Sequence, residues 1–523
     1  MRATTAWCWA RTHSNGVGLV ALVAFALICL YPVLGARFVL VDDGEILSYT
    51  AQTGLSTSVI EVIARDTATQ GRFRPVYWTF RLAEVHLLDD NSSAWHALVL
   101  CLGVAAAAIQ FLVARRIGVD VAPALLAAAL LLVGPGVSSI WVRLGPNETI
   151  ATVLLLVSLR AAVMANRRGL PWDALFIVSG LLAMLSKESF ALAAVGLAGF
   201  RLLLAAQNDR VRTRDIAAAG LMLVAGLGIA FIDYRIGATA GTTSYGGRYL
   251  AGANPLGYLL VLGHNGLIVA YASCAWIAAV AVAARPKATD RIWVSGALLA
   301  AVVVVPQVGL YSVQGVMEGR YEVPSTIALS LLTAFTVSKL RGAENSRLYR
   351  LAIGTWAGAA VLFGVSTWSY AAAFAADSRQ LDSMLSTVAE RASIGGSVAL
   401  VADPGRQYEP VLSMIQHLLY HGRGDLAVRM VPINPDGTYT ADESAFAADL
   451  RDTVPSLESA DCGDLRAVIL LADIPADQQV PCPLGSLRPL DFRAQVLEWG
   501  GETVSFRPRL PGLVTEGYRA YVP

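Results

Sequence analysis

Long apolar stretches follow one another over the first 375 residues of the sequence. A stretch of about 20 apolar residues can cross the roughly 30 Å hydrocarbon core of a bilayer as a helix. We predict eleven such spans, at residues 17–35, 94–114, 121–140, 148–165, 172–187, 189–206, 216–236, 256–283, 291–312, 323–338 and 349–374. Because backbone inside hydrocarbon has to satisfy its hydrogen bonds internally, the pattern predicts a polytopic α-helical membrane protein.

The composition agrees with a membrane protein. Of the 523 residues, 55% are hydrophobic and 15% are charged, with a mean hydropathy of +0.55. A soluble domain carries about 25% charged residues. The formal net charge of +1 gives no basic field that would attract nucleic acid, so we expect no nucleic-acid partner.

Basic residues recur in every second short loop, which predicts the orientation of the chain. They are Arg115, Arg116, Arg167, Arg168, Arg210, Arg212, Arg214, Arg285, Lys287, Arg291, Lys339, Arg341, Arg347 and Arg350. Cytoplasmic loops carry an excess of Lys and Arg, so these loops and the N-terminus are predicted inside. An odd number of spans then places the C-terminus outside. We expect a multi-pass protein of the cell membrane, either the plasma or the inner membrane.

The character of the sequence changes at about residue 376. The β-rich runs "SVALVAD", "LAVRMVPI" and "RAVILLADI" alternate with helical patterns such as "YEPVLSMIQHLLYHG". Alternating strand and helix signals predict an α/β domain with some parallel sheet. We therefore expect a transmembrane domain over residues 1–375 and an extracytoplasmic α/β domain over residues 376–523. Cys462 and Cys482 bracket a predicted strand there, and we predict a disulfide between them because disulfides persist outside the cytoplasm.

The outer loop at residues 36–93, where we expect juxtamembrane helices, has unusual charges. Asp42, Asp43 and Glu45 in "DDGEI" follow the first span directly, although carboxylates are costly near hydrocarbon. Four arginines breach the positive-inside pattern: Arg65, Arg72, Arg74 and Arg81. An anionic ligand on the outer face would explain the arginines, because their planar fork suits phosphate oxygens. Tyr77, Trp78 and Phe80 would then anchor the same segment at the membrane interface. An amphipathic helix that lies on anionic headgroups explains the arginines about as well, but it leaves the aspartates unexplained.

Further polar residues gather in other predicted outer loops. The segments "WVRLGPNETI", "LSKESF" and "MEGRYEVP" contain Arg143, Asn147, Glu148, Lys187, Glu188, Glu318, Arg320, Tyr321 and Glu322. A charge pair capping a tight hairpin is the simpler interpretation of Lys187 and Glu188 alone. Charge in four loops on one face predicts instead a single polar cavity that opens outward.

These motifs, in this order, resemble the GT-C superfamily of integral-membrane glycosyltransferases. The resemblance rests on the acidic pair after the first span, the basic and aromatic segment with "GRFRP", the "KE" after the fifth span and the "RY" before a late span. It covers roughly residues 17–340. Protein O-mannosyltransferases, lipid A aminoarabinose transferases and actinobacterial arabinofuranosyltransferases belong to this superfamily.

The resemblance implies an enzyme that moves a sugar from a polyprenyl-phosphate donor to a hydroxyl of a glycan, lipid or protein acceptor, with inversion, among the lipids of the outer leaflet. Either Asp42 or Asp43 would be the general base. The donor-phosphate contacts would be Arg72, Arg74, Lys187 and Arg320, and Glu148, Glu188 and Tyr321 would line the substrate pocket.

Three points stay open at this stage. The acidic pair Asp42 and Asp43 can hold Mg²⁺ or Mn²⁺, and can equally work without a metal. His417 and His421 have the spacing of a metal pair but lack a glutamate and a third ligand, so we expect surface histidines.

A transporter or flippase of lipid-linked sugars is the alternative function, although transporters place ionisable residues near the middle of the membrane. An assembly protein with a partner-binding outer domain is a third possibility.

The topology is directly testable. A reporter that is active only in the cytoplasm should be silent when it is fused after Pro523, because an odd number of spans places the C-terminus outside. The same reporter fused within the Arg210–Arg214 loop should be active and serves as the control. An active reporter at the C-terminus would contradict the predicted number of spans.

Overall fold

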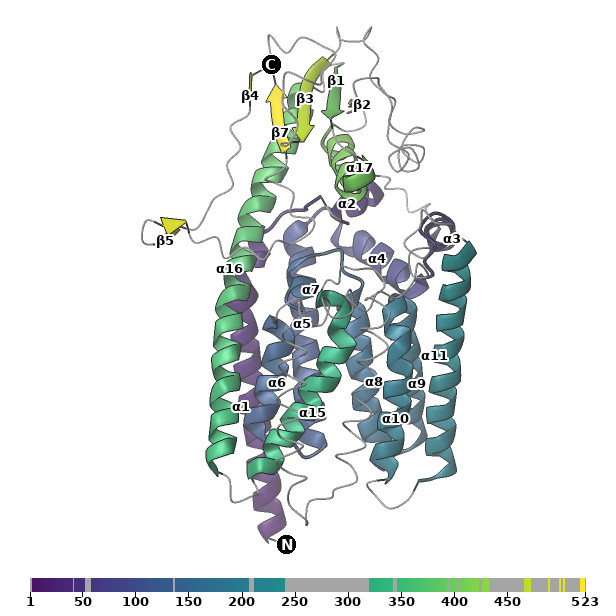
Figure 1. Cartoon of the computed structure of the whole chain (residues 1–523), viewed down its shortest axis with the longest axis vertical. Coiled ribbons are helices and arrows are strands. Elements are labelled where there is room, and N and C mark those ends of the chain that lie inside the picture. Colours follow the sequence, from purple (N-terminus) through teal and green to yellow (C-terminus); the bar gives the residue numbers. More distant parts are fainter. Residues whose placement is uncertain are drawn as a thin grey trace, which may run out of the picture. The chain divides into compact units, whose positions relative to one another are not determined.

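The computed structural model describes residues 2–40, 42–51, 58–134, 137–206, 211–239, 319–341, 346–392, 396–401, 404–422, 426–431 and 465–471, and short strands at 488–489, 498–499, 502–503 and 518–522 (Figure 1). The chain divides into two compact units. Unit 1 comprises Met1–Tyr31, Ser58–Arg81 and Leu98–Trp368, and unit 2 comprises Pro32–Thr57, Leu82–Ala97 and Ser369–Pro523. Each unit is described by itself.

Nine of the eleven predicted spans coincide with helices. These helices are α1 (Arg2–Leu30), α5 (Ser92–Arg116), α6 (Val121–Val133), α8 (Glu148–Arg168), α9 (Leu170–Ser186), α10 (Ala193–Ala206), α11 (Thr213–Thr239), α15 (Val323–Arg341) and α16 (Ser346–Ala392). The spans predicted at 256–283 and 291–312 lie outside the described residues. The protein is a multi-pass helical membrane protein.

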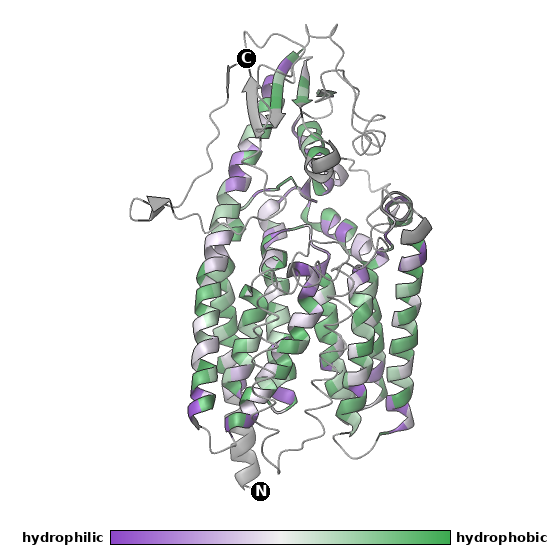
Figure 2. Ribbon diagram, in the orientation of Figure 1, coloured by the Kyte–Doolittle hydropathy of each residue, from purple (hydrophilic) through white to green (hydrophobic). Residues whose placement is uncertain are grey.

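Seven of the described helices are long and apolar enough to cross a membrane. Helix α6 is the shortest of the nine at 13 residues, which is about 20 Å at 1.5 Å per residue. The 47 residues of α16 give about 70 Å, more than twice the thickness of the hydrocarbon core. Figure 2 shows hydrophobic helix bodies with hydrophilic residues gathered at many of the helix ends. Exposed apolar side chains such as Val224, Phe231 and Val361 provide the surface that lipid covers.

Helix α6 is largely buried within unit 1. Its residues from Ala127 to Val133 are all buried, and it packs against α1 and α15. Gln110 on α5 donates to the Ala127 carbonyl over 3.1 Å and to Ser330 Oγ on α15 over 2.8 Å. Polar side chains that hydrogen-bond across helices stabilise packing where water is absent, so Gln110 joins three helices.

Two helices of the first outer loop contribute to unit 1. Helix α3 (Val59–Gln70) begins with a capping box in which Ser58 Oγ accepts from the Ile60 amide and the Glu61 carboxylate accepts from the Ser58 amide. Helix α4 (Pro75–Leu88) begins with a proline, which suits the first helical position because its missing N–H would have no partner there. The segment 71–74 between the two helices carries Arg72 and Arg74.

Helices α8 and α9 form a tight antiparallel hairpin through a single residue, Gly169. Its φ of +83° lies in the region that only glycine adopts without strain. At the other end of α9 the chain is extended at Lys187 and then enters the short 3₁₀ helix η2 (Glu188–Leu192) before α10. The sequence "SKES" at residues 186–189 therefore forms the junction between α9 and η2, which precedes α10.

A buried ion network joins α9, α10 and α11. The Arg201 side chain is fully buried and donates through Nε (3.1 Å) and Nη2 (2.9 Å) to Asp173 Oδ1, and through Nη2 to Asp215 Oδ1. Arg214 Nε lies 3.8 Å from Asp215 Oδ1. The Arg212 amide donates to Asp215 Oδ2 over 2.9 Å at the start of α11. Two basic and two acidic side chains thus balance one another inside this part of unit 1.

Unit 2 contains a mixed sheet with strand order β2-β1-β3-β7-β4. The three strand segments expected from the sequence are β1 (Ser397–Val401), β2 (Ala427–Val431) and β3 (Leu465–Leu471), and β1 pairs in parallel with both others. Strands β7 (Tyr518–Val522) and β4 (Arg488–Pro489) extend the sheet in antiparallel pairing. A separate pair consists of β5 (Glu498–Trp499) and β6 (Glu502–Thr503).

Helix α17 (Pro404–His421) connects β1 to β2 and completes a βαβ unit. It packs against α2 (Asp43–Ala51), the first helix of the outer loop (Figure 1). The predicted domain boundary at residue 375 falls inside α16, which is continuous from Ser346 to Ala392.

The Arg201 network predicts a large and specific loss of stability. Replacing Arg201 with Met leaves two buried carboxylates without their shared cation, which should cost about 3–5 kcal/mol. Replacing the exposed Arg212 with Met should cost less than about 0.5 kcal/mol because its side chain is solvated. Unfolding of both variants in mixed detergent and dodecyl sulfate micelles measures the difference. Equal stability of the two variants would contradict a structural role for the network.

Candidate functional site

The acidic turn that follows the first predicted span lies in unit 2. Asp42 is half-buried and has a φ of +65°, and Asp43 is fully buried as the first residue of α2. Asp43 Oδ2 accepts from the Val39 amide over 3.0 Å. A left-handed conformation costs a non-glycine residue about 1–3 kcal/mol, and such strain collects at functional sites. Asp42 is therefore the more accessible and the more strained of the two.

Helix α17 holds the same turn from the other side. The Gly44 amide donates to Ser413 Oγ over 3.0 Å, and His417 Nε2 donates to the Val39 carbonyl over 3.1 Å. A Cβ on residue 44 would lie 2.7 Å from both Cα and O of Ser413. Only glycine permits this approach, so the third residue of "DDG" is determined by packing.

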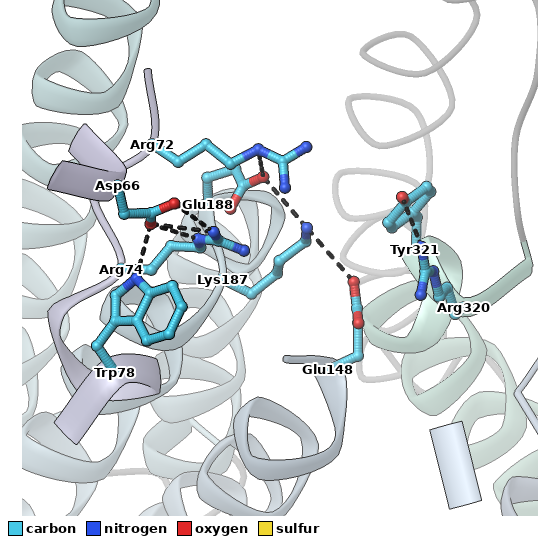
Figure 3. A network of polar contacts seen from close by, with 9 residues as sticks. All are labelled: Asp66, Arg72, Arg74, Trp78, Glu148, Lys187, Glu188, Arg320 and Tyr321. Atoms are coloured by element: carbon cyan, nitrogen blue, oxygen red, sulfur yellow. Dashed lines mark hydrogen bonds and ion pairs between the residues drawn. The ribbon is translucent and has the colours of Figure 1, made fainter. Parts of the chain in front are cut away.

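The basic segment "GRFRP" lies in unit 1, where Arg74 makes a tight pair with Asp66 of α3 (Figure 3). Arg74 Nε and Nη2 donate to the two Asp66 oxygens over 2.7–3.1 Å, and Trp78 Nε1 donates to Asp66 Oδ2 over 2.8 Å. The Asn147 amide oxygen accepts from Arg74 Nη1. Burial would lower the pKa of Arg74, but the Asp66 and Glu188 carboxylates hold that pKa above its ordinary value. Arg74 is a fully engaged, permanent cation.

Lys187 occupies the centre of a looser set of ion pairs (Figure 3). Its Nζ lies 3.5 Å from Glu148 Oε1 at the start of α8 and 3.2 Å from Glu188 Oε1. The same Glu188 oxygen lies 3.9 Å from Arg72 Nε. The buried Lys187 ammonium is thus paired with two carboxylates, one at the start of α8 and one at the start of η2.

The 3₁₀ helix η4 (Gly319–Glu322) carries Arg320, a third basic residue near Lys187 and Arg72. Arg320 Nη2 donates to Tyr321 Oη over 3.2 Å, and the Lys187 ammonium and the Arg320 guanidinium each lie 5.1 Å from the centre of the Tyr321 ring. Cations over an aromatic face are attracted by its quadrupole. Tyr321 thus connects the two basic residues.

Arg72, Lys187, Glu188, Arg320 and Tyr321 form the Lys187 cluster. The lengths of its ion pairs, compared with those of the Arg74–Asp66 pair, indicate what the cluster can do chemically. Arg74 uses both nitrogens of one edge on one carboxylate, whereas Arg72 and Lys187 share a single Glu188 oxygen at 3.9 and 3.2 Å. The Arg72 and Glu188 side chains are 17% and 15% exposed, so a ligand can reach them. Converging cations with long contacts suit the oxygens of a phosphate group.

The predicted site residues therefore fall into two groups. Arg72, Arg74, Lys187, Glu188, Glu148, Arg320 and Tyr321 come together in unit 1, and Asp42 and Asp43 lie in unit 2. Their roles in binding and catalysis stay predictions. Within the described ranges no three His, Cys, Asp or Glu side chains gather as metal ligands, and a role of Mg²⁺ or Mn²⁺ also stays a prediction. The predicted disulfide of Cys462 and Cys482 lies outside the described residues.

The sequence analysis missed two acidic residues of unit 1. Asp66 directly follows Arg65 in the outer loop, and the arginines of that loop were considered without it. Asp233 lies on α11, which packs against η2, and has Glu188 as an electrostatic neighbour. Both Asp233 oxygens are shielded from solvent, and no described residue hydrogen-bonds to them. A single aspartate inside the apolar segment "FIDYRIG" is the signal that would have found it, because such a residue is costly in a span.

Two sequence expectations are wrong. Tyr77 and Trp78 are not interface anchors, since both are buried: Tyr77 packs edge-on against Trp78 at 4.9 Å between ring centres, and Trp78 bonds to Asp66. His417 is not a surface residue, because its side chain is fully buried on the side of α17 that contacts the Val39 carbonyl. Both errors have one cause. Amphipathic side chains at a helix surface have the same sequence pattern whether water or protein covers them.

Comparison with known proteins yields solved structures only. No family model and no curated protein sequence matches the chain. The crystal structure of ArnT from Cupriavidus metallidurans bound to undecaprenyl phosphate is similar, with 14% identity over 87% of this chain and 93% of that chain and a TM-score of 0.51. The apo structure of the same protein gives 15% identity, 90% and 94% coverage and a TM-score of 0.48. ArnT is a GT-C glycosyltransferase. The first likeness shows that this chain shares the fold of that ArnT structure.

The close approach at Gly44 predicts the effect of a single methyl group. Gly44→Ala should destabilise the protein by about 1–3 kcal/mol, because the added Cβ meets the backbone of Ser413, which no change of rotamer relieves. Gly358→Ala in α16 is the matched control, since open space surrounds that position. It should be neutral or slightly stabilising. Detergent unfolding measures both variants, and a neutral Gly44→Ala would contradict the contact of α2 with α17.

Proposed function

We propose that the protein is a glycosyltransferase that moves a sugar from a polyprenyl-phosphate donor to an acceptor hydroxyl at the outer face of the cell membrane, with inversion. The observation that carries the proposal is the set of long, shared ion pairs around Lys187 in a chain with the GT-C fold. The contacts of the structural cation Arg201 with Asp173 are shorter, at 2.9 and 3.1 Å. The Lys187 set suits an anion that arrives and leaves with each reaction cycle.

The reaction needs a base and a stabilised leaving group. The acceptor O–H transfers its proton to Asp42 while its oxygen attacks the anomeric carbon, and the bond from that carbon to the phosphate oxygen breaks. The polyprenyl phosphate leaves with the bonding electrons. A positioned carboxylate can take the proton, and fixed cations stabilise the charge that develops on the phosphate. Arg72, Lys187 and Arg320 are the proposed phosphate contacts.

The assignment of Asp42 as the base has support from its surroundings. Asp43 is fully buried with one oxygen on the Val39 amide, whereas Asp42 is half-buried and strained. Only a carboxylate that an acceptor can reach can remove its proton. Asp43 is proposed to hold the turn in which Asp42 is presented.

The direct experiment is an assay with the purified protein. It is incubated with a panel of polyprenyl-phosphate sugars and cell-envelope acceptors, and released polyprenyl phosphate is measured by mass spectrometry. The proposal expects release from at least one donor, dependent on acceptor. No release from any donor would contradict it, and movement of intact donor across liposomes without release would favour a transporter.

Substitution of the acidic pair separates the two roles. Asp42→Asn should lower turnover about 10²- to 10⁴-fold with unchanged donor binding, because Asn tolerates the positive φ but accepts no proton. Asp43→Asn should lose much less, since its amide oxygen can still accept from the Val39 amide. Turnover and donor binding are measured for each variant. The reverse order of the losses would make Asp43 the base, and two fully active variants would remove the base altogether.

The arginines give a matched set of three variants. Arg72→Lys and Arg320→Lys should weaken donor binding and lower turnover with the fold intact, because an ammonium cannot reproduce a bidentate guanidinium contact with phosphate. Arg74→Lys should instead lower the unfolding free energy by about 1.5–3 kcal/mol, since its fork is bonded to Asp66. Steady-state kinetics and detergent unfolding measure the three. Full activity of the Arg72 and Arg320 variants would exclude them as phosphate contacts.

A further inference from the structure

The backbone of the acidic turn is held by a closed set of hydrogen bonds within unit 2. The Val39 amide donates to Asp43 Oδ2 over 3.0 Å, and the Val39 carbonyl accepts from His417 Nε2 over 3.1 Å and from Ser413 Oγ over 3.5 Å. The Gly44 amide donates to the same Ser413 Oγ over 3.0 Å. Residues 39, 43 and 44 are thus fixed on both sides of Asp42, and two of the side chains that fix them belong to α17.

His417 is suited to this task because it is neutral. Burial lowers the pKa of His417 to about 4, while its hydrogen bond to Val39 acts in the opposite direction. A carbonyl oxygen can only accept, so Nε2 carries the proton of the neutral ring. The side chain is fully buried, which removes competition from water. The Val39 carbonyl therefore has a constant donor over the physiological pH range.

The conformation of Asp42 requires such support. A φ of +65° at a non-glycine residue persists only where the surrounding structure over-determines it. Ser413 and His417 lie about 370 residues further along the sequence, and they supply contacts to this turn that are not local.

We propose that Ser413 and His417 are positioning residues of the reaction, and that the C-terminal α/β part of the chain serves to orient the Asp42 carboxylate through α17. This inference rests on the proposed function, in which Asp42 is the base. A displacement of about 1 Å at a catalytic group can cost on the order of 10²-fold in rate. The contacts of α17 would thus act on the chemical step and leave donor binding unchanged.

The test compares two kinds of substitution at each position. His417→Leu removes the donor to Val39, whereas His417→Gln keeps an N–H at the place of Nε2. Ser413→Ala removes the acceptor for the Gly44 amide and is the milder change. Gln416→Ala, at a half-exposed position on the same helix, is the matched control. We expect His417→Leu and Ser413→Ala to lower kcat about 10- to 100-fold with unchanged donor KM, and His417→Gln and Gln416→Ala to stay within about threefold of the wild-type kcat.

A double-mutant cycle asks whether these residues act through Asp42. In the Asp42→Asn background, His417→Leu should cause no further loss of kcat, because the group that it positions has already been removed. Additive losses would overturn the inference even if Asp42 proves to be the base. If His417→Leu caused a general structural defect, the donor KM would change as well, and His417→Gln would not restore kcat.

Hydrogen exchange gives a readout that does not depend on activity. Amide exchange of the peptide covering residues 39–51 should accelerate in His417→Leu and Ser413→Ala, and remain at the wild-type rate in Gln416→Ala. Unchanged exchange in the first two variants would overturn the inference. Faster exchange, together with full activity of Asp42→Asn, would refute the proposed base and leave the structural contact intact. The two failures are therefore distinguishable.

Discussion

An ionised side chain beside hydrocarbon has to be paired, and this requirement organises much of the described chain. Desolvation of a single charge costs several kcal/mol, and only a partner with good geometry compensates for it. Arg201 with its two aspartates joins α9, α10 and α11, and Arg74 with Asp66 joins the segment before α4 to α3. Both pairs have short contacts, so they stabilise the positions of the helices that carry them.

The cluster around Lys187 obeys the same requirement in a different way. Lys187 and Arg72 share one oxygen of Glu188, and the longest of these contacts is 3.9 Å. A polar group held by weak, shared contacts exchanges its partners at a smaller cost than one in a bidentate pair. The short contacts of Arg74 and Arg201 therefore distinguish pairs that hold helices together from a cluster that can receive an anion, although the two contain the same residue types.

The sequence predicted those features that depend on local patterns. Hydropathy located nine helices, and short β-rich runs located β1, β2 and β3. The charges of the outer loops also predicted that Lys187, Glu148 and Arg320 line one polar cavity. Partners far apart in sequence could not be predicted, because a single sequence contains no signal for them. The bond from Gly44 to Ser413 is an example. The pairing of Trp78 with Asp66 spans only 12 residues, but it joins two helices and turned an expected interface anchor into a buried side chain.

The three residues of "DDG" have three separate physical causes. The first position has a left-handed backbone, which aspartate tolerates better than most residues with a side chain. The second places a carboxylate oxygen on the Val39 amide, which fixes the start of α2. The third lies against the backbone of Ser413, where no Cβ fits. Glycine at the first position would relieve the strain, and it would also remove the carboxylate. In the proposed reaction this strained aspartate would be the base, presented by a turn that Asp43, Gly44 and α17 hold in place.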